Sequence, residues 1–264
     1  MLPMNYGIIT KILSPVRSGP DHRNEMINQM LFGENFRIKE EIGEWIKIES
    51  LLDSYTGWLV RKDILPLTKE NIEINFKSKV IVTKRLTRIY NALNKNESFL
   101  ILPGSTLPGF NKQKNTFHIG STTYIVETNS FTEQARDLKE AIIETARTFL
   151  HAPYLWGGRS LFGIDCSGFT QIVFKINGIN LPRDASQQAG IGTLVPFLNE
   201  SKPGDLAFFD NEDGNITHVG ILAGQGEIIH TSGDVHIDSI DYQGINDKTS
   251  KEYSHKLRLI KSIF

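Results

Sequence analysis

One residue of the sequence has the chemistry of a strong nucleophile: Cys166, the only cysteine among 264 residues. Apolar residues follow it at helical spacing, namely Phe169, Ile172, Val173 and Ile176, and the pair Asn177 and Gly178 is a typical helix stop. The sequence therefore predicts that Cys166 lies in the first turn of a helix, where unpaired backbone N–H groups and the helix dipole favour a thiolate over a thiol. The alternative interpretation of a lone cysteine is a small buried core residue.

A cysteine nucleophile needs a base, and the base needs a third group that holds its ring. Of seven histidines, His218 and His230 lie at mirrored positions about Gly224 in a predicted hairpin. An odd-numbered loop centred on Gly224 places both side chains on one face of the sheet, whereas a two-residue loop places them on opposite faces. On one face, against the Cys166 helix, they would form a Cys–His–His set. His218 would then take the thiol proton, and His230 would orient His218.

A zinc site is the competing interpretation, because one cysteine and two histidines could supply three ligands. The sequence has no CxxC or HxxxH pair beside them, so we expect neither a metal nor another cofactor. The remaining histidines fall in segments that resemble loops or barrel strands, and we assign them no catalytic role: His22, His118, His151, His236 and His255.

Composition is that of a folded protein, with 39% hydrophobic and 22% charged residues. The net charge of −1 gives no reason to expect nucleic acid or an anionic membrane as a partner. A single cysteine excludes an intramolecular disulfide. The sequence begins without a charged leader and apolar core, and it contains no run of about 18 apolar residues, so we expect a cytoplasmic protein without a membrane span.

The hydrophobic pattern divides the chain into three predicted parts. Residues 1–66 contain short alternating strands separated by Gly, Asp and Asn, which indicate a small β-barrel, and residues 75–130 repeat this style less regularly. From Thr132, a plausible N-cap, the period becomes helical, and this helix must end before Pro153. Strand patterns follow the Cys166 helix, so residues 131–264 are expected to form an α+β domain with helices packed on an antiparallel sheet.

A set of motifs in a fixed order resembles a known family, the NlpC-type papain-like cysteine peptidases that cut bacterial cell-wall peptides. The motifs are Tyr154-Leu155-Trp156-Gly157-Gly158-Arg159, Asp165-Cys166-Ser167-Gly168-Phe169, Leu181-Pro182-Arg183, Pro203-Gly204-Asp205-Leu206, His218-Val219-Gly220-Ile221 and Ile229-His230. The resemblance covers residues 131–264. The N-terminal half resembles bacterial SH3-like domains through Ser14-Pro15-Val16-Arg17, Leu31-Phe32-Gly33-Glu34 and Tyr55-Thr56-Gly57-Trp58. The combination is similar to γ-D-glutamyl-L-diamino-acid endopeptidases of the dipeptidyl-peptidase VI type.

The resemblance implies catalytic roles for residues that match the family's motifs. Cys166 would be the nucleophile, His218 the base and His230 the orienting residue. Tyr154 would lie beside the thiol, where its hydroxyl and the backbone N–H of Cys166 could donate to the developing oxyanion.

The resemblance also implies a substrate site. Asp165 would meet the ammonium of a terminal alanine, and Ser167 and Ser186 would bind polar groups near the γ-glutamyl unit. In the family the first SH3-like domain closes one end of the groove with an acidic residue and a tyrosine, which match Glu25 and Tyr55 here.

The resemblance implies hydrolysis of the bond between γ-D-glutamate and lysine or diaminopimelate in murein-derived peptides with a free N-terminal L-alanine, and thus a part in murein peptide recycling. Which diamino acid is preferred stays open, as does whether Arg159 or Arg183 binds the glutamate carboxylate. Two other functions compete: a catalytically silent cell-wall binding module, and a thiol acyltransferase or amidase on the same scaffold.

Overall fold

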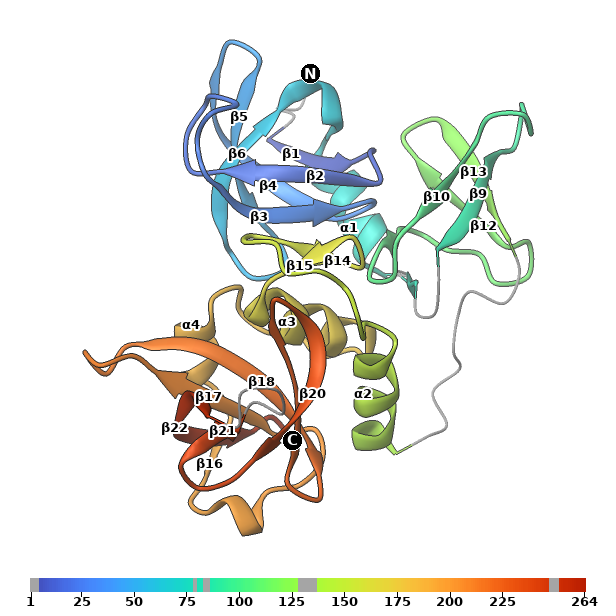
Figure 1. Cartoon of the computed structure of the whole chain (residues 1–264). Coiled ribbons are helices and arrows are strands. Elements are labelled where there is room, and N and C mark those ends of the chain that lie inside the picture. Colours follow the sequence, from blue (N-terminus) through green and yellow to red (C-terminus); the bar gives the residue numbers. More distant parts are fainter. Residues whose placement is uncertain (1–4, 78–79, 83–85, 128–136, 247–251) are drawn as a thin grey trace. The chain divides into compact units, whose positions relative to one another are not determined.

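The chain forms two compact units, Met1–Glu133 and Gln134–Phe264, as the computed structural model in Figure 1 shows. The structure describes residues 5–77, 80–82, 86–127, 137–246 and 252–264. Within these residues, none of the helices has the length and apolar character needed to cross a membrane.

The first part of the N-terminal unit is one antiparallel sheet in the order β3-β2-β6-β5-β4-β1-β7. Its elements are β1 (Tyr6–Ile9), β2 (Leu13–Arg17), β3 (Met26–Leu31), β4 (Asn35–Ile42), β5 (Trp45–Ser50), β6 (Thr56–Val60), the 3₁₀ turn η1 (Arg61–Asp63) and β7 (Ile64–Leu67). In β5, Ile46 and Ile48 are buried while Lys47 and Glu49 are half-buried, which is the period of two expected for a strand with one core face.

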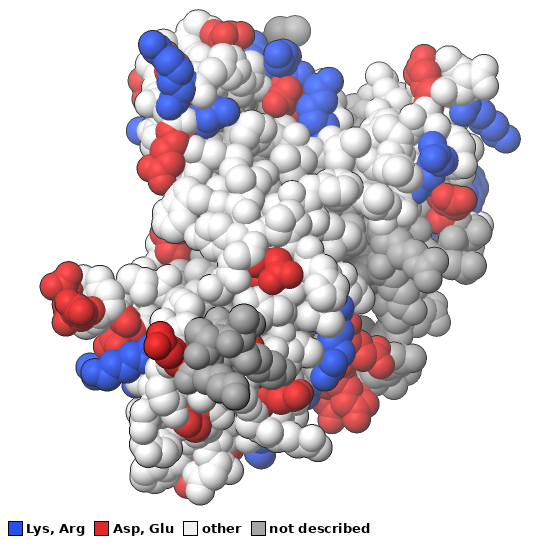
Figure 2. Space-filling view, viewed as in Figure 1, with Lys and Arg blue, Asp and Glu red and all other residues white. Residues whose placement is uncertain are grey.

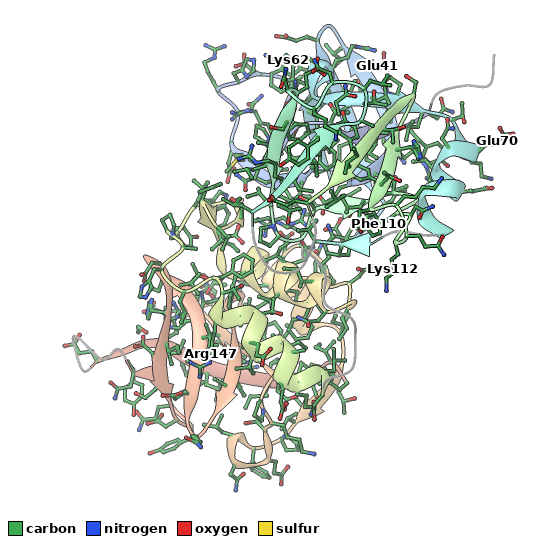
Figure 3. The ribbon with its side chains drawn as sticks, turned by 90° about the vertical axis from the view of Figure 1, so that its right-hand side faces the viewer. Glu41, Lys62, Glu70, Phe110, Lys112 and Arg147 are labelled. Carbon is green, nitrogen blue, oxygen red and sulfur yellow. The ribbon has the colours of Figure 1, made fainter. Side chains whose placement is uncertain are left out.

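The second part of this unit adds α1 (Lys69–Lys77) and two smaller sheets, β10-β9-β13-β12 and β11-β8. Its strands are β8 (Val80–Ile81), β9 (Thr87–Asn91), β10 (Ser98–Ile101), β11 (Thr106–Leu107), β12 (Thr116–Ile119) and β13 (Thr122–Val126). One hydrophobic core joins the two parts, because Phe32 and Leu67 of the first pack in the same cluster as Phe117 of the second. Buried Phe110 belongs to this core, whereas Glu41 and Lys62 are exposed (Figure 3).

The C-terminal unit begins with helices and continues with strands. Its elements are α2 (Leu138–Arg147), β14 (Arg159–Ser160), β15 (Gly163–Ile164), α3 (Cys166–Ile176), α4 (Ala185–Ala189), β16 (Thr193–Val195), the 3₁₀ turn η2 (Leu198–Glu200), β17 (Leu206–Asp210), β18 (Ile216–Gly224), β19 (Glu227–Ser232), β20 (Asp234–Ile240), β21 (Gly244–Asn246) and β22 (Tyr253–Ser262). The predicted α+β class, with strand-rich segments before a domain in which helices pack on an antiparallel sheet, is confirmed.

The large sheet of this unit curls on itself. Its order is β16-β22-β17-β18-β19-β20-β21, and β21 also pairs with β22. Helix α3 packs against β18 and β19 and is buried along its whole length, including the polar Thr170 and Gln171. A helix that is covered on all sides is a buried core helix, so the packing around α3 fixes the position of its first residue.

Two sequence expectations concern the segment that precedes α3. The predicted N-cap Thr132 lies outside the described residues. In the structure α2 starts at Leu138, and the Asp137 side chain caps it by accepting the N–H of Lys139 at 2.8 Å. The helix ends at Arg147, ahead of Pro153 as expected.

On the face shown in Figure 2, basic and acidic side chains are interspersed and separated by uncharged surface. This distribution is consistent with the net charge of −1.

Candidate active site

Cys166 is the first residue of α3, so the predicted position at a helix start is confirmed. The side chain of Asp165 caps the helix by accepting the Gly168 N–H at 2.7 Å. A β-carbon at Gly168 would come within 2.2 Å of the Gly158 carbonyl oxygen. Glycine at this position therefore lets the preceding loop lie against the first turn that carries the sulfur.

Both histidines of the predicted set lie on the β18–β19 hairpin, and their rings are in contact. Nε2 of His218 is 3.0 Å from Nδ1 of His230, which places the two side chains on one face of the sheet. The hairpin loop itself differs from the prediction. It consists of two residues, Gln225 and Gly226, both with positive φ, and not of an odd-numbered loop centred on Gly224.

A β-bulge explains why His218 and His230 lie on the same face of the sheet although the hairpin loop has two residues. The register of β18 against β19 shifts between Leu222 and Gly224, so β18 contains one extra residue near the turn. A one-residue shift exchanges the two faces of a strand. The bulge therefore cancels the effect of the two-residue loop and returns His218 and His230 to the same side.

Cys166, Tyr154 and His218 line one cavity of about 310 Å³, together with Thr217, Thr231, Ser232, Gly233 and His255. The Cys166 Sγ–H donates to the carbonyl oxygen of Thr217 at 3.9 Å. Only 8% of Cys166 and 6% of His218 is exposed. Nucleophile and base thus face one small cavity in which a reacting carbonyl could sit.

The protonation of the thiol differs from the prediction. Burial, followed by the charge of Asp165, raises the pKa of Cys166 to about 11, although backbone N–H groups of Val219 and Ser167 act in the opposite direction. The direction of this shift is opposite to the expectation that the helix start favours a thiolate, because the loss of water opposes the helix terminus.

The predicted base, His218, is buried as well. Burial lowers the pKa of His218 well below its usual range, and the neighbouring His255 and His230 lower it further. A neutral imidazole can accept a proton, whereas an imidazolium cannot. The neutral ring is therefore the form of His218 that can act as the base.

Tyr154 is held beside the nucleophile by backbone contacts. Its N–H donates to the carbonyl oxygen of Gly233 at 2.8 Å, and its side chain lines the Cys166 cavity. Burial, followed by the neighbouring Cys166 and Asp165, raises the pKa of Tyr154 above its usual value. The phenol therefore keeps its proton at neutral pH and can donate a hydrogen bond to an oxyanion.

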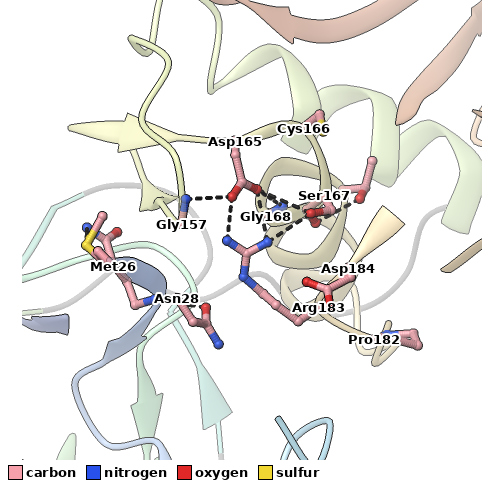
Figure 4. Close-up of polar contacts among 12 residues, drawn as sticks. Met26, Asn28, Gly157, Asp165, Cys166, Ser167, Gly168, Pro182, Arg183 and Asp184 are labelled. Carbon is pink, nitrogen blue, oxygen red and sulfur yellow. Dashed lines mark hydrogen bonds and ion pairs between the residues drawn. The ribbon is translucent and has the colours of Figure 1, made fainter. Parts of the chain in front are cut away.

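The Asp165 carboxylate is surrounded by donors of the protein itself (Figure 4). It accepts the N–H of Gly157 at 2.8 Å, that of Gly168 at 2.7 Å and the Ser167 hydroxyl at 3.3 Å. Arg183 forms a bidentate ion pair with it, at 3.0 and 2.5 Å. A substrate ammonium would have to compete with Arg183 for these oxygens, so the role of Asp165 in amine binding stays a prediction.

The other predicted substrate residues occupy different places. Ser167 is buried, and its hydroxyl accepts a hydrogen bond from Arg183 at 2.9 Å, whereas Ser186 is exposed on α4. Glu25, which is exposed, and Tyr55, which is half-buried, belong to the N-terminal unit. The binding roles of these four residues stay predictions.

Sequence reasoning missed three residues beside the histidine pair. His236 and His255 lie on strands β20 and β22 of the C-terminal sheet, where the sequence indicated loop-like or barrel segments. The His255 ring stacks on His218 with centroids 4.1 Å apart, and the pKa of His255 is lowered to about 4, mainly by burial. The third is Asp238, whose Oδ2 is 3.2 Å from Nε2 of His230. The alternation of Val235 and Ile237 is the signal that could have revealed β20.

Two groups among the described residues have ligand atoms close enough to hold a metal ion: His218 with His230 and His255, and His230 with His236 and Asp238. Both groups share His230. Each nitrogen–oxygen contact in the second group is also a good hydrogen bond, at 3.2 Å from His230 and 3.1 Å from His236 to Asp238. Protons therefore satisfy these atoms as well as a metal would.

A second, larger cavity of about 830 Å³ adjoins the first, because Thr217 and His255 line both. Its other lining residues are Asp210, Asn211, Glu212, Gly214, Tyr242, Gln243, Tyr253, Ser254, Lys256 and Leu257. Glu212 and Lys256 are exposed and carry opposite charges. The site can thus receive a substrate that extends past His255 and ends in charged groups.

Comparison with known proteins agrees with this geometry. The NlpC/P60 family matches residues 151–254, and the bacterial dipeptidyl-peptidase SH3 domain matches residues 16–64. The γ-D-glutamyl-L-lysine dipeptidyl-peptidase of Bacillus subtilis (strain 168) is 36% identical over 224 residues, which are 79% of this chain and 73% of that protein. Dipeptidyl-peptidase 6 of Lysinibacillus sphaericus is 25% identical over 263 residues, 89% of this chain and 92% of that protein. The crystal structure of an NlpC/P60 family protein from Bacillus cereus ATCC 10987 covers 98% of this chain and 99% of its own, with a TM-score of 0.82 and 21% identity.

Proposed function

Because the chain belongs to the NlpC/P60 family of cysteine peptidases, we propose that it hydrolyses the bond between γ-D-glutamate and a diamino acid in cell-wall peptides. The peptides would begin with a free L-alanine, the diamino acid would be lysine or diaminopimelate, and the product would be L-Ala-γ-D-Glu. The observation that carries the proposal is the cavity shared by Cys166, Tyr154 and His218, with His230 behind His218.

In the first half of the reaction the Cys166 sulfur attacks the γ-carbonyl carbon of the D-glutamyl residue while its proton passes to His218. The carbonyl oxygen becomes an oxyanion, to which the Tyr154 hydroxyl donates. The backbone N–H of Cys166 is a second donor, since the first N–H groups of a helix have no acceptor within the helix. His218 then returns the proton to the leaving amine, the C–N bond breaks, and a thioester on Cys166 remains.

In the second half, water enters the position that the amine has left. His218 takes a proton from this water, whose oxygen attacks the thioester carbon, and the sulfur leaves as a thiol after the proton returns to it. L-Ala-γ-D-Glu is released. The same base serves both halves, which requires its ring to stay fixed throughout the cycle.

The leaving diamino acid belongs on the side of the residue that protonates it. His218 is that residue, and the larger cavity begins beside it at Thr217 and His255. We therefore place the diamino acid in this cavity, where Glu212 would meet its distal ammonium and Lys256 the second carboxylate of diaminopimelate.

This placement is tested by the Glu212→Gln variant, assayed with L-Ala-γ-D-Glu-L-Lys. KM should rise about 3- to 10-fold with little change in kcat, because the lost interaction is the same in ground and transition states. Asp213→Asn removes a neighbouring exposed carboxylate that does not line the cavity and is the matched control. An unchanged KM in Glu212→Gln would contradict the placement.

A free amino terminus is the other specificity element. We propose that an anionic group receives the alanine ammonium, since a cation taken out of water needs an anionic partner. The candidates predicted from the sequence are Asp165, Glu25 and Tyr55. Such a requirement suits an enzyme that acts in the cytoplasm on murein fragments and not on intact, glycan-linked peptide.

The experiment that tests the proposed function compares matched peptides with free and acetylated alanine. The free peptide should be cleaved and its product identified by mass spectrometry, while acetylation should reduce kcat/KM by about 100-fold or more through loss of a charge-assisted contact. Equal cleavage would refute the amine requirement. Cleavage by folded Cys166→Ala would refute the proposed chemistry altogether.

A further inference from the structure

A buried carboxylate lies directly behind the catalytic histidines. Oδ2 of Asp238 is 3.2 Å from Nε2 of His230, and Nδ1 of His230 is in turn 3.0 Å from Nε2 of His218. Exposure is 4% for Asp238, 1% for His230 and 6% for His218. The three side chains thus form a buried, hydrogen-bonded chain from the Asp238 carboxylate to His218, the base in the Cys166 cavity.

The strand register explains how this hydrogen-bonded chain is built. His230 of β19 lies opposite His236 of β20, and Asp238 follows two residues later on the same face of β20. Asp238 is therefore the diagonal neighbour of His230, within reach of its ring. His236 holds the carboxylate from the other side, with its Nε2 3.1 Å from Oδ2.

These hydrogen bonds also determine which ring nitrogens of His230 and His218 carry a proton. An ionised carboxylate only accepts hydrogen bonds, so Nε2 of His230 must carry the proton that it shares with Asp238. In a neutral imidazole the other nitrogen is then an acceptor, and Nδ1 of His230 accepts Nε2–H of His218. Nδ1 of His218 is left without a proton, and this is the form of the ring that can take the proton of Cys166.

We infer that Asp238 is a positioning residue for the hydrolysis: it fixes His230 and, through it, His218 in the tautomer that accepts the thiol proton. The inference rests on the proposed function. The negative charge of Asp238 also stabilises the imidazolium that forms on His218 during attack. A neutral His230 alone would stabilise this cation less. The proton thus passes from Cys166 to His218, while His230 and Asp238 hold the His218 ring in place.

A metal ion bound by His230, His236 and Asp238 is the alternative use of the same atoms. It would hold Nε2 of His230 by coordination in place of a proton and would orient the ring equally well. Dialysis against a chelator, followed by assay with and without added Zn²⁺, separates the two arrangements.

The main test uses Asp238→Asn, which keeps the shape but loses the charge, and Asp238→Leu, which loses the acceptor as well. We expect kcat to fall about 10-fold in the first and about 100-fold in the second, with KM within about 2-fold of wild type, because an orienting group acts only through the base. Asp234→Asn is the matched control. It removes a carboxylate of the same strand that contacts His236 at 2.9 Å, and it should leave kcat within about 2-fold.

A second readout does not depend on turnover. Nitrogen-15 NMR of the histidine rings should show His218 with its proton on Nε2 in the wild type and a mixture of tautomers in Asp238→Leu. The same tautomer in both proteins would overturn the inference, as would wild-type kcat in Asp238→Asn or loss of activity on chelation that Zn²⁺ restores. If the wild type cleaves no peptide, the proposed function fails, while the NMR result still decides whether Asp238 sets the tautomer.

Discussion

Removing the Arg183 guanidinium should destabilise the C-terminal unit strongly, because it would leave a buried carboxylate without its counter-charge. Arg183 is 2% exposed and Asp165 is 5% exposed, and their contact is bidentate. Arg183→Met keeps most of the aliphatic stem, so the variant removes the charge and its hydrogen bonds with little change in packing volume.

The size of the effect follows from what Asp165 retains. Breaking a buried ion pair by removing one partner costs about 3–5 kcal/mol of unfolding free energy. Asp165 would still accept the N–H groups of Gly157 and Gly168, so the lower end, about 3 kcal/mol, is expected. For a unit of this size such a loss lowers Tm by about 10 °C.

Differential scanning calorimetry and urea unfolding measure this loss, and Arg258→Met is the matched control. Arg258 pairs with Asp210 at 3.5 Å, but its side chain is 62% exposed, so its removal should cost less than about 1 kcal/mol. The reasoning would be refuted if both variants lost the same stability, or if Arg183→Met stayed within about 1 kcal/mol of wild type.

Two further predictions follow from the site. The thiol of Cys166, with its pKa raised to about 11, should react with iodoacetamide about ten times faster for each pH unit between 7 and 9, since the thiolate fraction rises in that proportion. A rate that is constant across this range would show a standing thiolate instead. Gly220→Ala should lower kcat and cost about 1–3 kcal/mol of stability, because its β-carbon would lie 2.7 Å from Ile228 Cδ1 and 2.9 Å from His230 Cβ. Gly190→Ala meets only the Gln187 carbonyl oxygen at 3.3 Å and should change both quantities little; equal effects would contradict the steric argument.

Local sequence signals were sufficient to predict that the nucleophile, Cys166, lies at the start of a helix. Apolar residues at helical spacing after Cys166 indicated a helix that begins near it, and the structure places the start of α3 at this residue. The pKa of the thiol could not be predicted in the same way. It depends on how much water the surrounding strands and loops exclude, which is a tertiary property.

The positions of His218 and His230 could be predicted only in part from the sequence pattern. Mirrored positions about a glycine indicated the shared face of His218 and His230, but a bulge in β18 and not an odd-numbered loop produces it. The same argument applied about Gly233 pairs His230 with His236. The mirror argument about Gly233 would therefore have placed Asp238 on the same face as His230. The stacking of His255 on His218 could not be predicted in this way, because it depends on β22, which is far away in sequence.

The most direct test of the central claim is interception of the thioester on Cys166. Hydroxylamine added during turnover of L-Ala-γ-D-Glu-L-Lys competes with water for an acyl-enzyme but not for the intact amide. The account predicts that mass spectrometry detects the hydroxamate of L-Ala-γ-D-Glu, in an amount that rises with hydroxylamine and is absent with Cys166→Ala. Continued release of free L-Ala-γ-D-Glu without any hydroxamate would contradict a covalent intermediate on Cys166.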